Sequence, residues 1–202
     1  MALGASPAFA QDVTIAALGD SLTAGFGLAA DEGFVPQLQA WLQARGHDVA
    51  ILNAGVSGDT TAGGLARAAW TLTPGVDGMI LALGGNDLLR GLPAETARQN
   101  LAGILHVAAA QDVVVLLAGL PAPANFGAAY QAEFNAIYPD LAAEFDTIYV
   151  ADFLAGLQLA FEAGVPRSDL LLPDGIHPTA QGVTFMVEEM GPAVEALIAE
   201  VE

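Results

Sequence analysis

A serine behind an apolar run, together with a distant Asp/His pair, supplies the side chains of this sequence best suited to chemistry. Residues 13–18 (Val-Thr-Ile-Ala-Ala-Leu) lead directly into Gly-Asp-Ser-Leu, which places Ser21 at the carboxyl end of an expected strand. That end of the strands is where α/β sheets bind their ligands. Far downstream, Asp174 and His177 are close enough in sequence for one turn to present both side chains. The set predicts Ser21 as a nucleophile, His177 as its base and Asp174 as the carboxylate that orients the base.

Each of these residues also has a simpler interpretation when it is taken alone. Ser21 is suited to capping a helix after the strand, and Asp174 with His177 is typical of a solvated loop. Asp and His are metal ligands too, but no further ligand keeps a fixed spacing with them, so no metal site is predicted. The chain order Ser, Asp, His is that of α/β hydrolases, yet Gly-Asp-Ser-Leu-Thr lacks the second glycine of G-x-S-x-G, which disfavours a nucleophile elbow. The joint occurrence of the three residues with two further motifs favours catalysis.

The two further motifs are polar, glycine-rich segments that follow other apolar runs. They are residues 53–59 (Asn-Ala-Gly-Val-Ser-Gly-Asp) and 83–87 (Leu-Gly-Gly-Asn-Asp). Attack on an ester carbonyl places negative charge on its oxygen, and donors fixed in advance around that oxygen lower the barrier. We expect the backbone N–H groups of Ser21 and Gly58 and the carboxamide of Asn86 to form such an oxyanion hole. A positive-φ turn glycine and an Asx-turn asparagine remain the alternative roles of Gly58 and Asn86.

Apolar runs of strand length alternate with helix-like segments along the chain. Nearly continuous apolar runs are typical of strands covered on both faces of a parallel sheet. The expected strands are 13–18, 49–52, 79–83, 113–118 and 148–150, and the expected helices are 34–45, 62–71, 94–110, 130–145 and 179–199. This alternation predicts an α/β fold built as a three-layer α/β/α sandwich.

Length and charge narrow the class of protein. A chain of 202 residues is long enough for one well-buried core, so residues 12–202 are predicted to form a single domain. Only five basic residues, all arginine, oppose 23 acidic ones, and the net charge of -18 argues against nucleic-acid binding. No apolar stretch reaches the roughly 18 to 20 residues of a membrane span, so stable membrane insertion is not expected. Cysteine is absent, which excludes a thiol nucleophile.

The first eleven residues suggest export. Ala8-Phe9-Ala10 fits the small-x-small pattern of a signal-peptidase site, although the charged start and most of the apolar segment of a signal are not in the sequence. We interpret residues 1–11 as a signal-peptide remnant or a disordered tail. The first interpretation predicts a periplasmic or secreted protein, and the second leaves a cytoplasmic location open.

The four motifs, in their order along the chain, resemble those of the GDSL, or SGNH, hydrolase superfamily. Residues 84–91 (Gly-Gly-Asn-Asp-Leu-Leu-Arg-Gly), 123–127 (Pro-Ala-Asn-Phe-Gly) and 137–139 (Ile-Tyr-Pro) are similar to the bacterial arylesterase group, which includes a periplasmic thioesterase/lysophospholipase. The resemblance covers roughly residues 14–197. It implies a flavodoxin-like parallel sheet of five strands in the order 2-1-3-4-5. It also implies hydrolysis of esters or thioesters through an acyl-serine, without metal or cofactor.

The resemblance also implies that the segment after Asn86 lines the acyl site. Asp59, Asp87 and Asp20 are expected to brace the catalytic loops by hydrogen bonds, and Asp20 is a candidate for substrate contact as well. The candidate substrate-binding residues are Asp20, Leu88, Leu89, Arg90, Phe126 and Ile176. Few cations are present to receive anionic head groups, since Arg90 is the only one that adjoins a catalytic motif. We therefore favour esters with short or medium acyl chains and neutral leaving groups.

Other functions share these residues or dispense with them. An acyl-CoA thioesterase or lysophospholipase and a carbohydrate O-deacetylase would use the same triad. A non-catalytic flavodoxin-like binding module would use residues 19–27 as a ligand loop, but it gives no role to Asp174 and His177. The expected partner is a small-molecule ester or thioester, and no motif indicates a protein partner.

Overall fold

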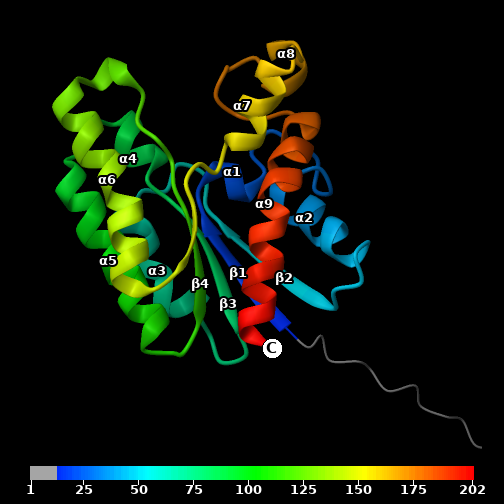
Figure 1. Ribbon diagram of the computed structural model, residues 1–202, viewed down its shortest axis with the longest axis vertical. Helices are drawn as coiled ribbons and strands as arrows, with labels where there is room; N and C mark the ends of the chain where they lie inside the picture. The colour runs from blue at the N-terminus through cyan, green and yellow to red at the C-terminus, as the bar shows by residue number, and fades with distance from the viewer. Residues whose placement is uncertain (1–12) are drawn as a thin grey trace, which may run out of the picture.

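The computed structural model describes residues 13–202 and places a five-stranded parallel sheet at the centre (Figure 1). The strand order is β2-β1-β3-β4-β5, which confirms the predicted order and the α/β class. The strands are β1 (Val13–Gly19), β2 (Val49–Gly55), β3 (Gly78–Ala82), β4 (Val114–Ala118) and β5 (Ile148–Val150). The expectations for residues 1–11 lie outside the described residues, and the single-domain assignment remains a prediction.

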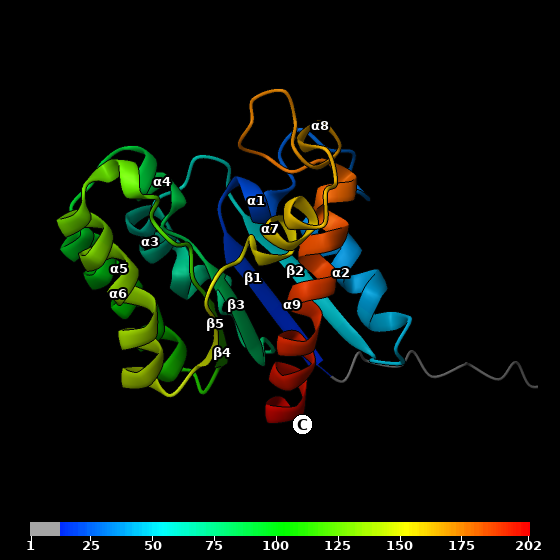
Figure 2. The ribbon, with the colours of Figure 1, turned by 45° about the horizontal axis from the view of Figure 1, so that its top comes forward.

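Helices cover both faces of the sheet, as the two views together show (Figures 1 and 2). Each face buries its own hydrophobic cluster, one centred on Leu81 and Leu117 and the other on Ile80 and Leu116, because successive strand residues point to opposite faces. The helices of the Leu81 face are α3 (Thr61–Thr71), α5 (Ala94–Ala109) and α6 (Ala128–Phe145). Those of the Ile80 face are α2 (Phe34–Gln43), α7 (Ala155–Glu162) and α9 (Ala180–Val201).

Helix starts follow capping rather than hydrophobic periodicity. Thr60 and Thr179 are N-caps whose side chains accept hydrogen bonds from Gly63 N and Gly182 N, at 3.4 and 3.1 Å. The helix expected from residue 179 therefore begins one residue later, and the helix expected from residue 62 begins one residue earlier.

Several short elements were not predicted. They are α1 (Ser21–Ala24), α4 (Gly85–Leu89), the 3-10 helix η1 (Ala124–Phe126), α7 and α8 (Arg167–Leu170). Helix α7 packs against α9 at Gly156, where an added Cβ would lie only 2.0 Å from the carbonyl oxygen of Phe185. The close approach of two helix backbones is a tertiary requirement, and glycine weakens the local helix signal that would have indicated α7.

The register brings the polar loops to one edge of the sheet. Gly19 of β1 is paired with Gly55 of β2 and with Ala82 of β3, so the segments that follow these three strands emerge side by side. In Figure 2, α1, α7 and α8 all lie near this edge, and the C-terminus lies at the opposite one. Between residues 13 and 202, no helix is both long and apolar enough to cross a membrane.

Candidate active site

Ser21 is the first residue of α1 and follows β1 after a single intervening aspartate. Asp20 is the N-cap of this helix, and its Oδ1 accepts a hydrogen bond from Leu22 N at 3.0 Å. The capping role that was an alternative for Ser21 is therefore filled by Asp20. The Ser21 hydroxyl is left available for another partner.

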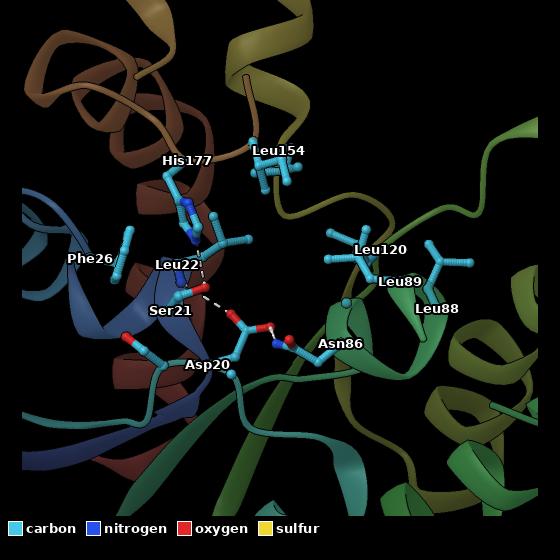
Figure 3. A pocket seen from close by; sticks show the side chains of 14 residues that line it. Asp20, Ser21, Leu22, Phe26, Asn86, Leu88, Leu89, Leu120, Leu154 and His177 are labelled. Carbon is cyan, nitrogen blue, oxygen red and sulfur yellow. Dashed lines mark hydrogen bonds between the residues drawn. The ribbon is translucent and has the colours of Figure 1, made fainter. Parts of the chain in front are cut away.

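That partner is His177, which comes from the loop before α9. Its Nε2 lies 2.9 Å from Ser21 Oγ, and its Nδ1 lies 2.7 Å from Asp174 Oδ2. Figure 3 shows the imidazole pointing toward the serine, and the Phe26 ring packs beside it with centroids 4.5 Å apart. With Nδ1–H donating to the carboxylate, the neutral imidazole presents a lone pair at Nε2. The arrangement is able to take a proton from Ser21 Oγ.

Asp174 is held in its ionised form by donors from its own loop. Its Oδ1 accepts hydrogen bonds from the backbone N–H groups of Ile176 and His177, at 2.9 and 3.0 Å. The Ile176 N–H, followed by the His177 side chain, lowers the pKa of Asp174 to about 2. The bridge between Leu171 and Pro178 closes this loop. A carboxylate is therefore present beside the imidazole throughout the neutral range.

The expected oxyanion donors meet next to the serine. Gly58 adopts φ +81°, so it also fills the turn role that was its alternative. The backbone N–H groups of Gly58 and Ser21 have no acceptor within residues 13–202. Asn86 lies in the first turn of α4, and its Nδ2 donates to Asp20 Oδ2 at 3.2 Å, which leaves one amide hydrogen for a ligand. Burial raises the pKa of Asp20, although the Leu22 N–H and then the Asn86 amide oppose that rise.

Arg67 of α3 ties three segments of the site together, and sequence reasoning missed it. Its Nε donates to Asp59 Oδ2 at 2.8 Å, and its two terminal nitrogens donate to the carbonyl oxygens of Ala54 and Gly19, at 2.6 and 2.9 Å. One guanidinium thus joins the ends of β1 and β2 to the loop of Gly58. An arginine in the middle of a helix gives no sequence signal of such contacts.

Asp87 braces the same region from the side of α4. Its side chain is fully buried, and its two oxygens accept from Thr61 N and Thr61 Oγ1 at 2.8 and 2.6 Å. Asn100 Nδ2 also donates to Thr61 Oγ1, at 3.0 Å. Asp87 and Asp59 therefore both make the hydrogen bonds expected of bracing residues, and they join α4 and the Gly58 loop to α3.

We expect Arg67→Met to lower the free energy of unfolding by about 2 to 3 kcal/mol, because three acceptors lose a charged donor. Urea denaturation measures this change. Arg98→Met is the matched control, since Arg98 pairs with Asp140 at 3.0 Å and Asp140 is 56% exposed, whereas Asp59 is 12% exposed. An exposed pair contributes roughly 1 kcal/mol or less. Equal losses in the two variants would contradict the bracing role of Arg67.

A cavity of about 280 Å³ opens beside Ser21 and is lined mainly by apolar side chains. Four of the expected substrate residues line it, namely Asp20, Leu88, Leu89 and Ile176. The lining also includes five residues that were not predicted from the sequence, namely Leu22, Phe26, Ser57, Leu120 and Leu154. These five come from four segments distant in sequence, which only the fold brings together.

Two expected substrate residues do not line this cavity. Arg90 turns back to the Gly58 loop, where its Nη2 donates to Gly58 O at 2.7 Å. Phe126 lies in η1 and packs against the core cluster beside Tyr130, with ring centroids 5.9 Å apart. Both side chains make these contacts outside the cavity lining, and their contact with a substrate stays a prediction.

No group of three or more His, Cys, Asp or Glu side chains within residues 13–202 is arranged to hold a metal ion.

Comparison with known proteins gives concordant results. Residues 17–184 match the GDSL-like lipase/acylhydrolase family. The chain is 37% identical to esterase TesA of Pseudomonas aeruginosa over 92% of its own length and 89% of that protein. It is 34% identical to thioesterase 1/protease 1/lysophospholipase L1 of Escherichia coli over 92% of its own length and 85% of that protein. The crystal structure of AlinE4, an SGNH-hydrolase family esterase, superposes with a TM-score of 0.73 at 44% identity, covering 96% of this chain and 98% of that one.

Proposed function

The chain belongs to the GDSL-like lipase/acylhydrolase family and is a carboxylic ester hydrolase, and we propose that Ser21 is its nucleophile toward aryl and alkyl esters with short or medium acyl chains. The observation that carries this proposal is the series of contacts from Asp174 through His177 to the Ser21 hydroxyl. The apolar cavity beside Ser21 supports an acyl or aryl group as the part of the substrate that is bound.

In the proposed reaction, Ser21 Oγ attacks the ester carbonyl while its proton passes to His177 Nε2. The carbonyl oxygen becomes negative and receives hydrogen bonds from Ser21 N, Gly58 N and Asn86 Nδ2. Collapse of the tetrahedral intermediate expels the alcohol, which takes the proton from His177. Water then attacks the acyl-serine with the same base, and the acid and free Ser21 are released.

Active-site labelling tests the assignment of the nucleophile. A fluorophosphonate reacts with a serine only where a base activates the hydroxyl, so we expect one equivalent of probe to be attached to Ser21, as mapped by peptide mass spectrometry. The His177→Ala protein should label slowly. Rapid labelling at another serine would show that the nucleophile lies elsewhere.

Thioester and lysophospholipid substrates form the second candidate, which the name of the Escherichia coli relative favours. The charges of this chain oppose it. The five arginines have partners within the protein: Arg67 and Arg98 pair with carboxylates, Arg90 and Arg167 donate to backbone carbonyls, and Arg45 stacks on Trp41 at 3.4 Å. None of them lines the cavity beside Ser21.

Carbohydrate O-deacetylation remains an alternative with the same triad, and hydrolysis of acetylated sugars would identify it.

We expect kcat/KM for an acyl-CoA to rise with ionic strength, while that for a neutral p-nitrophenyl ester of the same chain length stays nearly constant. The net charge of -18 repels a polyanion at a distance, and salt screens that repulsion. Initial rates from low to physiological salt, with both substrates below their micellar limits, measure the effect. A fall in acyl-CoA turnover with added salt would mean that local attraction dominates and would reverse the preference for neutral esters.

We also propose that the protein acts in the periplasm or outside the cell, on the strength of Ala8-Phe9-Ala10 at the start of the chain. Fractionation of the cells that produce the protein, with amino-terminal sequencing of the recovered chain, tests this location. A start after Ala10 in the exported fraction is the expected result, and recovery from the cytoplasm would refute it.

A further inference from the structure

A second hollow continues from the cavity beside Ser21. The two cavities are adjacent, because four side chains line both of them: Leu88, Leu120, Leu154 and Ile176. In Figure 3, Leu154 and Leu120 lie on the side of the cavity away from Phe26. The second hollow has a volume of about 340 Å³ and extends toward α7, with Leu157, Gln158 and Phe161 in its wall. A distal group of a substrate whose carbonyl lies at Ser21 would enter this hollow past the side chains that line both cavities.

Asp152 is the one ionisable side chain that lines this second hollow, as far as the described residues show. It is half-buried, and its Oδ1 accepts a hydrogen bond from Leu154 N at 2.8 Å. No ion pair within residues 13–202 includes Asp152. Burial raises its pKa, and the Leu154 N–H opposes that rise. A carboxylate among apolar side chains is costly without a cationic partner, so a bound cation would offset that cost.

The neighbouring polar groups leave this carboxylate free for a ligand. Gln158 Nε2 donates to Glu162 Oε1 at 3.0 Å, away from Asp152. Arg167 Cζ lies 5.9 Å from the centroid of the Phe161 ring, and its Nη2 donates to Gly175 O. Arg167 lines an adjacent hollow that shares Leu171 and Gly175 with this one, but it forms no ion pair with Asp152. The wall that Asp152 shares with Leu157, Leu171 and Phe161 is thus apolar around a single negative charge. Such a site suits an ammonium group carried on carbon, since aromatic and carboxylate groups both attract it.

We propose that the hollow at Asp152 is a cation subsite, and that the enzyme prefers esters with an ammonium group at the far end of the acyl or alcohol part. The inference rests on the proposed esterase function, because the reacting carbonyl must lie at Ser21. The proposed function favours uncharged over anionic substrates, and this inference adds that cationic substrates are favoured over uncharged ones.

Pairs of isosteric substrates test the proposal. One arm compares p-nitrophenyl ω-trimethylammonio-alkanoates of increasing length with their neutral ω-tert-butyl counterparts, which places the cation in the acyl part. The other arm compares choline esters with 3,3-dimethylbutyl esters, which places the cation in the alcohol part. We expect kcat/KM of the wild-type enzyme to favour the cationic ester by roughly tenfold in one arm at the best length, as a charge-assisted contact would give.

The Asp152→Asn substitution keeps an acceptor for Leu154 N and removes the charge, so the ratio of cationic to neutral kcat/KM should fall to near one. Glu200→Gln removes the same charge near the C-terminus of α9, at the opposite edge of the sheet, and should leave the ratio unchanged. A wild-type ratio near one in both arms would overturn the subsite. A preference that survives in Asp152→Asn would assign it to overall charge instead. Hydrolysis of the neutral esters reports separately on the esterase function, whose failure would abolish turnover of every substrate.

Discussion

We expect replacement of Ser21 by alanine to lower kcat for p-nitrophenyl esters by roughly 10⁴-fold or more, by analogy with other serine hydrolase triads. The physical reason is the loss of the atom that forms the acyl intermediate, which His177 Nε2 contacts at 2.9 Å. Without Oγ, only binding and the oxyanion donors remain to assist attack by water. Within residues 13–202, Ser21 Oγ is hydrogen-bonded to the His177 ring alone, so the variant should unfold at a similar urea concentration.

The comparison with other variants makes this prediction specific. His177→Ala should lose a similar factor, and the double variant should lose little more than either single one, because the two groups act as a unit. Ser168→Ala is the control, since Ser168 is exposed on α8 and its hydroxyl donates only to the neighbouring Asp169. Near-wild-type esterase activity in purified Ser21→Ala would refute the assignment of the nucleophile.

The sheet could be predicted because most of its strands are marked by an apolar run within their own stretch of sequence. Strands β1 and β3 are buried on both faces and have nearly continuous apolar sequences. Asp20 follows β1 directly, and the Gly84-Gly85-Asn86 segment begins two residues after β3. The meeting of Ser21, Gly58 and Asn86 then follows from parallel register, since Gly19, Gly55 and Ala82 lie at the same level. The proximity of Asp174 and His177 to one another is a property of one turn, although their position over Ser21 depends on the fold.

The rest of the site depends on side-chain directions that sequence does not encode locally. Arg90 and Phe126 lie close to motif residues in sequence, but Arg90 donates to Gly58 O and Phe126 packs against the core cluster, and neither direction could be predicted from sequence position. Arg67 makes its three contacts with residues 8, 13 and 48 positions away along the chain. Leu120 and Leu154 reach the cavity from the segments that follow β4 and β5. Tertiary geometry alone selects such residues.

The Asn86→Ala substitution should reduce kcat by about 10² to 10³, a loss of roughly 3 to 4 kcal/mol of transition-state stabilisation, with little change in KM. The carboxamide is fixed before the substrate arrives, because Nδ2 already donates to Asp20 and the α4 turn is held by the Asp87–Thr61 hydrogen bonds. A donor aligned in advance favours the oxyanion over the neutral carbonyl, because it interacts more strongly as charge develops. The effect therefore belongs in kcat.

Steady-state kinetics on one neutral ester separate this role from loosening of the loop. Asn100→Ala is the matched control, because the Asn100 carboxamide also donates a hydrogen bond, to Thr61 Oγ1 at 3.0 Å. Asn100 belongs to the hydrogen bonds that support α4 and does not lie beside Ser21. This substitution should lower stability and leave most of kcat intact. Equal losses of kcat in the two variants would mean that the loss in Asn86→Ala comes from loosening of the hydrogen bonds that support α4. A large rise in KM at constant kcat for Asn86→Ala would instead make Asn86 a ground-state binding residue, because uniform binding alters KM alone.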